Sequence, residues 1–135
     1  MTALATDRLT PRRPGHQFSF PVEAASKIFA GSIVCINAAG NATKGITSTT
    51  LKTVGVAQDQ ADNTSGAAGA IQVPVERGIW RFANSTAGDL IALANVGATC
   101  YVVDDQTVAL TNGTGTRSAA GTVRDVDASG VWVEF

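Results

Sequence analysis

The sequence has little of what enzymes most often use for chemistry. It holds one histidine, two cysteines and 16% charged residues in a chain of 135 residues. The nucleophile pattern GxSxG, the phosphate-binding pattern GxxxxGK[ST] and the zinc-binding pattern HExxH are all missing. His16 has no acidic partner fixed beside it in sequence, so we do not expect it to act as a general base. These absences favour a protein that is not an enzyme and uses no cofactor.

Long apolar runs are missing as well. The first thirty residues hold no run of signal-peptide length, and no later run approaches the roughly 18 residues of a membrane span. We therefore expect neither secretion nor a membrane partner. In that setting Cys35 and Cys100, which lie in the apolar runs IVCIN and TCYVV, are predicted to be small buried thiols rather than a disulfide or a metal pair.

Charge is sparse and unevenly placed along the chain. The formal net charge is −1. Residues 1–16 hold three arginines against Asp7 alone, a net charge of +2, which leaves −3 for residues 17–135. Two prolines in the same stretch, Pro11 and Pro14, favour an extended backbone. We predict an extended basic N-terminal arm over residues 1–16 and a single β domain over residues 17–135.

Short apolar runs separated by Gly, Asn and Asp turns are what the rest of the chain has in abundance. They predict about ten strands, and many short strands with polar turns indicate an all-β protein, a compact β-sandwich or small β-barrel. The predicted strands cover residues 17–22, 27–29, 32–37, 53–58, 71–77, 79–83, 99–104, 107–110, 121–125 and 131–135. The one stretch with helical spacing is 86–96, where a single apolar stripe on one or two turns is predicted from Leu90, Ile91, Leu93 and Ala94.

A weak internal similarity links two segments of the chain. VGVAQDQAD at 54–62 resembles AGTVRDVDA at 120–128, and each precedes a valine-rich strand, QVPVE or VWVEF. We interpret the pair as two similar hairpins rather than a duplication, because a repeat architecture needs sustained self-similarity.

Three aromatic residues raise the possibility of nucleic-acid binding, because stacked bases need exposed rings beside cations. The alternation in GIWRF, however, places Trp80 and Phe82 on one face and Ile79 and Arg81 on the other. We therefore expect these rings, and Trp132, to pack in a core or a subunit contact.

Acidic residues cluster at two places where a turn is the simpler interpretation. DVDASG at 125–130 resembles the start of a calcium-binding loop, but the acid that such a loop needs at its twelfth place is missing, since Phe135 is the eleventh. Asp104 and Asp105 lie between the apolar runs TCYVV and TVAL. We predict a hairpin turn at both places, and no metal site.

The order of the segments supports a resemblance to a known class of protein. GSIVCINAAGNATKG is followed by LKTVGVAQDQADNTSGAAGAIQVPVERGIWRFANS, then by GDLIALANVGATCYVVDDQTVALTN and AAGTVRDVDASGVWVEF. From Phe20 to Phe135 this order resembles the small head proteins of tailed bacteriophages, which include the decoration, or cement, proteins that reinforce capsids. The resemblance implies a compact β domain on the outside of the shell, often a trimer, that joins neighbouring major capsid subunits.

The expectation is therefore a structural virion protein on the capsid surface, made in the host cytoplasm. Its partners would be the major capsid protein and further copies of itself, as a homotrimer or a dimer. The predicted contacts with capsid or sister subunits lie in the arm: Arg8, Pro11, Arg12, Arg13, Pro14 and His16. The alternatives are another phage component, such as a tail, tube or fibre protein, and, with less support from the net charge, a nucleic-acid-binding β module.

Overall fold

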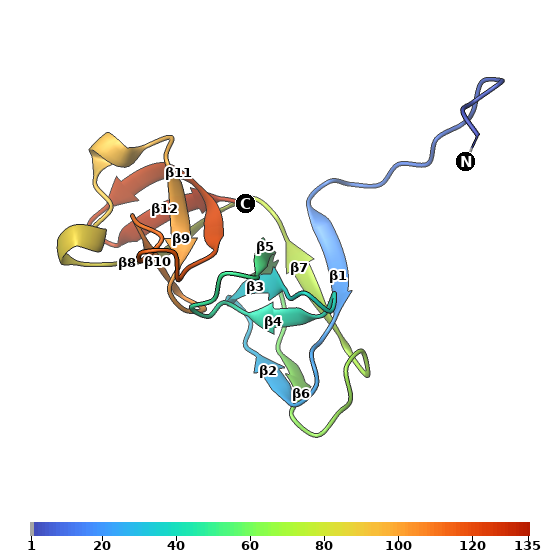
Figure 1. Cartoon of the computed structure of the whole chain (residues 1–135), viewed down its shortest axis with the longest axis horizontal. Helices are drawn as coiled ribbons and strands as arrows, with labels where there is room; N and C mark the ends of the chain where they lie inside the picture. The colour runs from blue at the N-terminus through green and yellow to red at the C-terminus, as the bar shows by residue number, and fades with distance from the viewer. Residues whose placement is uncertain (1) are drawn as a thin grey trace.

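The computed structural model describes residues 2–135, and the fold is all-β, as predicted (Figure 1). Each of the ten predicted strands overlaps an observed one. The strands are β1 (Gln17–Pro21), β2 (Ser26–Ile28), β3 (Ile33–Ile36), β4 (Ala42–Lys44), β5 (Lys52–Ala57), β6 (Ala61–Asn63), β7 (Gln72–Glu76), β8 (Ile79–Asn84), β9 (Thr99–Val102), β10 (Thr107–Ala109), β11 (Ala119–Asp127) and β12 (Gly130–Glu134).

The sequence-based prediction missed two strands, β4 and β6. Each has three residues, ATK and ADN, which is too short to show an alternating pattern. The composition of these segments does not by itself favour a strand. β4 pairs antiparallel with β3, and β6 pairs antiparallel with β2, so the partner strand determines the conformation of each.

The predicted apolar stripe at 86–96 is wrong. The segment forms two separate 3-10 turns, η1 (Ala87–Asp89) and η2 (Leu93–Asn95). Ile91 is buried between the turns because the Asn84 side chain bonds both its N–H and its carbonyl oxygen, at 3.0 and 2.8 Å. Leu90 and Leu93 are 49% and 65% exposed. A side chain–backbone clamp, rather than helical periodicity, therefore selects the residue that enters the core.

One group of strands forms a five-stranded sheet in the order β1-β7-β5-β3-β4, which we call the first unit. A single parallel bridge between Val22 and Ala42 joins the two ends of this sheet. The two-stranded antiparallel sheet of β2 and β6 packs against it, and the enclosed core includes Val34, Val73 and Val75.

The remaining strands form a closed barrel in the order β10-β8-β12-β11-β9, which we call the second unit. Parallel pairing of β8 with β10 closes it, with Val108 opposite Asn84. Its interior is filled by valines and by Phe82, which is 6% exposed. Figure 1 shows the two units side by side, with the C-terminus between them.

The two units have the same topology. Written from its first strand, the second unit reads β8-β12-β11-β9-β10, which matches β1-β7-β5-β3-β4 position by position. The registers match as well. Phe18 and Phe20 lie opposite Val75 and Val73 in the first unit, and Trp80 and Phe82 lie opposite Val133 and Val131 in the second.

Glycines at equivalent places strengthen this match. A Cβ atom on Gly55 would collide with the carbonyl oxygen of Glu76, and one on Gly121 with that of Glu134. In each unit the strand pairing shifts register beside this glycine. The interpretation of the two similar segments as separate hairpins is therefore wrong, because they belong to a repeat of five strands each. The second copy is a tight hairpin, whereas β5 and β7 of the first are separated by β6.

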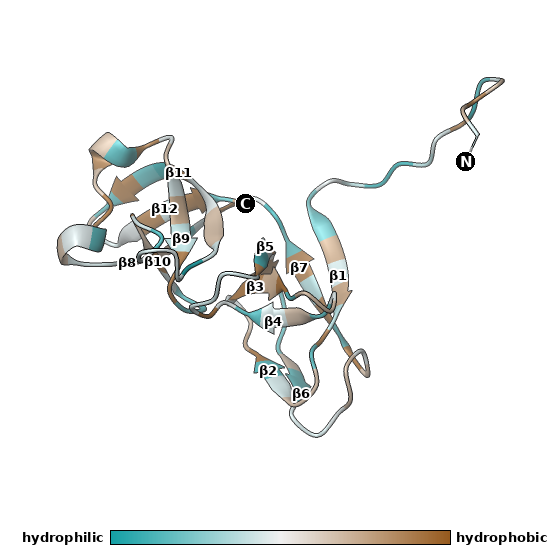
Figure 2. Ribbon diagram, viewed as in Figure 1, coloured by the Kyte–Doolittle hydropathy of each residue, from teal (hydrophilic) through white to brown (hydrophobic). Residues whose placement is uncertain are grey.

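The two units share an apolar interior at their junction. β3 points Val34 into the core of the first unit, while Ile33 and Cys35 pack against the core of the second. The equivalent strands β5 and β11 meet there, and the Thr53 hydroxyl donates a hydrogen bond to the Ala119 carbonyl oxygen at 2.9 Å. Figure 2 shows hydrophobic residues concentrated on the strands of both units.

Candidate functional site

Residues 2–16 form an arm that leaves the first unit and projects away from it (Figure 1). No strand or helix occurs in these residues, and every one of them is exposed. The chain enters β1 at Gln17, one residue after the arm ends. The conformation agrees with the extended arm that the two prolines favour.

The predicted contact residues do not gather into one site. Arg12, Arg13 and Pro14 line one shallow surface hollow. Arg8 lines another with Leu4, Ala5, Thr6 and Asp7, further along the arm. Pro11 lies between the two groups along the chain, and His16 lies at the root beside β1. The arm therefore presents its cations one after another along an extended chain rather than as a compact patch.

Two leucines in the arm were missed by the sequence-based reasoning. Leu4 is 73% exposed and Leu9 is 95% exposed. Each lies close in sequence to arginines, so an apolar side chain and a cation are presented together. Covering an exposed leucine with a partner surface is favourable, because it removes apolar area from water. In the sequence the signal is the presence of apolar residues within a polar arm.

The root of the arm is held by contacts with the first unit. The His16 carbonyl oxygen accepts a hydrogen bond from the Arg77 N–H at 2.7 Å. The Arg13 guanidinium lies 4.7 Å from the centroid of the Phe18 ring, within the range of a cation–π contact. Phe18 in turn stacks on Phe20, with ring centroids 6.1 Å apart. Arg13 is thus placed by an aromatic ring, whereas Arg8 and Arg12 lie out along the arm.

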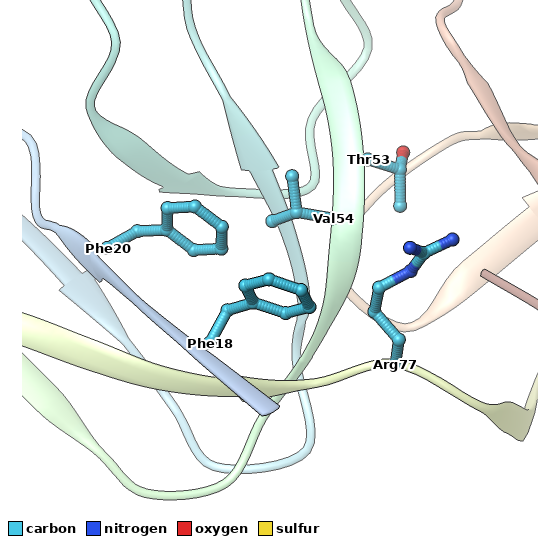
Figure 3. A pocket seen from close by; sticks show the side chains of 5 residues that line it. All are labelled: Phe18, Phe20, Thr53, Val54 and Arg77. Carbon is cyan, nitrogen blue, oxygen red and sulfur yellow. The ribbon is translucent and has the colours of Figure 1, made fainter. Parts of the chain in front are cut away.

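A hollow of about 230 Å³ opens beside this root, at one end of the first unit (Figure 3). Its lining residues are Phe18, Phe20, Thr53, Val54 and Arg77. In Figure 3 the two rings and Val54 form one side, and the Arg77 side chain lies at the other. None of these residues was predicted from the sequence to be part of a site. Only the pairing of distant strands brings them together.

The cysteines are buried thiols, as predicted. Cys35 and Cys100 are both free and buried. Burial raises the pKa of the Cys35 thiol, and it raises the pKa of Cys100 to about 11. A thiol with a raised pKa is a poor nucleophile near neutral pH, because the thiolate is the reactive form. Residues 2–135 hold no group of three or more His, Cys, Asp or Glu side chains arranged to bind a metal ion.

The acidic segments form turns, as predicted. Asp127 and Gly130 pair at the end of the β11–β12 hairpin, and Asp127 accepts a hydrogen bond from the Ser129 N–H at 2.7 Å. Asp104 accepts one from the Gln106 N–H at 2.9 Å in the turn between β9 and β10. These carboxylates therefore hold backbone N–H groups within their own turns.

The prediction of core packing is confirmed for two of the three aromatic residues, whereas the third, Trp132, lies outside the core. Phe82 is buried and Trp80 packs against the same core, while Ile79 and Arg81 of β8 are exposed. Trp132 instead lies on the outer face of the barrel, opposite Arg81. The Arg81 guanidinium lies 5.7 Å from its ring centroid, and its indole N–H donates to Asp127 at 2.8 Å. The Trp132 side chain is therefore already engaged by two residues of the same chain.

No helix among residues 2–135 has the length and apolar character needed to cross a membrane. Comparisons with protein-family models, curated proteins and solved structures found no match to this chain.

Proposed function

We propose that the protein is a structural virion protein that binds the outer surface of a phage capsid and stabilises the junctions between major capsid subunits. The observation that carries the proposal is the arm, which extends from the folded body with its arginines and leucines exposed. The resemblance in segment order, from Phe20 to Phe135, indicates the type of particle.

Reach is the first property that suits the arm to this role. Residues 2–16, if fully extended, span at most about 50 Å at ~3.3 Å per residue. An arm of this length contacts a surface well beyond the footprint of a domain of this size. A capsid repeats the same junction many times, so a modest contact at each junction stabilises the whole shell.

Preorganisation is the second property. Pro11 and Pro14 restrict the backbone before binding, which lowers the conformational entropy lost when the arm is immobilised. Arg13 is already placed against Phe18 at the root. Arg8 and Arg12 are left to form paired hydrogen bonds with carboxylates on a neighbouring subunit, for which a planar guanidinium is well suited.

The proposal includes self-association on the capsid, as a trimer or a dimer, since the body and arm carry opposite net charge. Residues 2–16 carry +2 and residues 17–135 carry −3. An arm that reaches the body of a sister subunit therefore meets an attractive field. For the arm to be attracted to the capsid in the same way, the capsid surface must present acidic groups.

Electron cryomicroscopy of virions or procapsids with and without this protein tests the function. We expect added density at repeated positions on the outside of the shell, above junctions between major capsid subunits. Unchanged density at every junction overturns the proposal. Density inside a tail, tube or fibre instead assigns the protein to that component.

A binding assay tests the role of the arm separately. Capsids that lack the protein are mixed with the wild type, with Arg8→Gln/Arg12→Gln, or with a matched control, Lys44→Gln/Lys52→Gln, and then sedimented. Lys44 and Lys52 are exposed on the first unit, so both variants lose the same charge. We expect at least a tenfold weaker affinity for the arm variant alone. Equal affinity of both variants excludes the arm, and steeply salt-dependent binding to free DNA supports the nucleic-acid alternative.

A further inference from the structure

The repeat allows the same place to be compared in the two units. In the first unit Arg77 follows β7 and donates its N–H to His16, the residue before β1, at 2.7 Å. In the second unit Phe135 follows β12 and donates its N–H to Gly78, the residue before β8, at 3.0 Å. Arg77 and Phe135 are therefore equivalent residues.

Phe135 fills its place with a ring. It packs edge-on against Phe82, with centroids 5.5 Å apart and an angle of 72° between the ring planes. Both rings belong to the apolar cluster of the second unit. The end of the barrel is thus closed by a pair of aromatic rings in a favourable geometry.

In the first unit the corresponding ring is missing. Phe20 is equivalent to Phe82, since each lies opposite a buried valine, Val73 or Val131. Arg77 stands where Phe135 would be, and its side chain lines the hollow of about 230 Å³. We call this hollow the socket. A cavity of about 150 Å³ in another protein holds a benzene molecule, so the socket has room for an aromatic side chain.

The socket also carries a positive charge at its edge, from Arg77. Arg77 lies at the side of the socket (Figure 3). The Arg13 guanidinium lies over the Phe18 ring but is not part of the socket lining. Arg77 is exposed. The nearest acidic residue along the chain, Glu76, lines a separate hollow with Arg13 and Phe18 and is not part of the socket lining. The lining is mostly apolar, and Arg77 is its one charged side chain.

We propose that the socket binds an aromatic side chain of a partner protein, with a carboxylate next to that side chain paired to Arg77. The second unit shows how the ring would be held, because Phe135 makes the equivalent contact within the same chain. The Arg77 guanidinium selects an acidic neighbour. The socket lies beside the root of the arm, so a partner seated in it and one held by the arm lie close together. This inference does not depend on capsid binding.

Short peptides test the inference on the isolated full-length protein. The probe is acetyl-Asp-Phe-amide, and the matched probes are acetyl-Lys-Phe-amide, which reverses the charge, and acetyl-Asp-Ala-amide, which lacks the ring. Binding is followed by the backbone amide signals of ¹⁵N-labelled protein. We expect the first probe to shift the signals of Phe18, Val54 and Arg77, with at least tenfold weaker binding of the other two.

Two variants locate the binding. Arg77→Phe supplies the missing ring within the chain and is expected to abolish binding of acetyl-Asp-Phe-amide. Arg77→Glu keeps the socket open and is expected to favour acetyl-Lys-Phe-amide instead. Arg81→Glu, on the outer face of the second unit, is the control and leaves binding unchanged. The inference is overturned if the three probes bind equally, if none shifts these signals at millimolar concentration, or if both Arg77 variants bind as the wild type does.

Discussion

Arg77 occupies in the first unit the position that Phe135 occupies in the second. Each residue follows the last strand of its unit, and each donates its N–H to the residue before the first strand, His16 or Gly78. The backbone is thus the same at the two places and the side chain differs. A ring closes one unit, and a cation leaves the other open.

Supplying the ring in the first unit is expected to stabilise the protein. Arg77→Phe places an aromatic side chain against Phe20, where Phe135 packs against Phe82 in the second unit. Partial burial of the ring contributes roughly 1 kcal/mol to the free energy of unfolding. Chemical denaturation measures the gain. Lys44→Phe, at an exposed position of β4, is the control and gives no gain. A loss of stability in Arg77→Phe contradicts the equivalence of the two positions.

The strands of this fold were largely predictable from the sequence, whereas their arrangement was not. Alternation in GIWRF correctly separated the buried Phe82 from the exposed Arg81, because a strand places successive side chains on opposite faces. The repeat was hidden because it consists of matched pairings between strands far apart in the chain, while its sequence signal is limited to two nine-residue segments. The position of Trp132 outside the core was not predictable either, since its ring is held by contacts on the barrel's outer face.

The arm was predictable and the socket beside it was not. Prolines and arginines in a short stretch without apolar alternation indicate an extended segment by their own local properties. The socket instead combines side chains of β1 and β5 with Arg77, which follows β7. Arg77 looks like an ordinary surface cation in the sequence. Its importance comes from the position it shares with Phe135, which only the pairing of the strands reveals.

The two equivalent glycines provide a test of the repeat. Gly55→Ala and Gly121→Ala each place a Cβ atom against a backbone carbonyl oxygen, that of Glu76 or Glu134, which has little freedom to move. Gly55 also has φ of +145°, a conformation unfavourable for other residues. We expect each variant to lose about 2 kcal/mol or more of stability. Gly88→Ala, where the added atom meets nothing within 4 Å, is the control. Losses in both variants comparable to that of Gly88→Ala would show that neither close approach matters.

Removing the arm is expected to leave the fold intact. A variant that lacks residues 1–15 keeps His16, whose carbonyl oxygen bonds Arg77, and loses only residues that are exposed in the part the structure describes. It also loses the Arg13 contact with Phe18, which contributes roughly 0.5–1 kcal/mol at an exposed site. Thermal unfolding checks stability, and capsid sedimentation checks attachment, which we expect to weaken. Unfolding of the shortened protein would instead place the arm in the core.

The hairpin of β11 and β12 is expected to depend on the ionisation of Asp127. Hydrogen bonds from the Trp132 indole and from the Ser129 N–H lower the pKa of this carboxyl below its ordinary value of 3.8. Because the pKa is lower in the folded state, the contribution to stability is present above pH 3.8 and is lost as the pH falls through the folded-state pKa. The indole N–H signal of Trp132 should therefore titrate with a midpoint below 3.8. Asp127→Asn should remove this titration, and a midpoint at or above 3.8 in the wild type would show that these bonds do not favour the charged form.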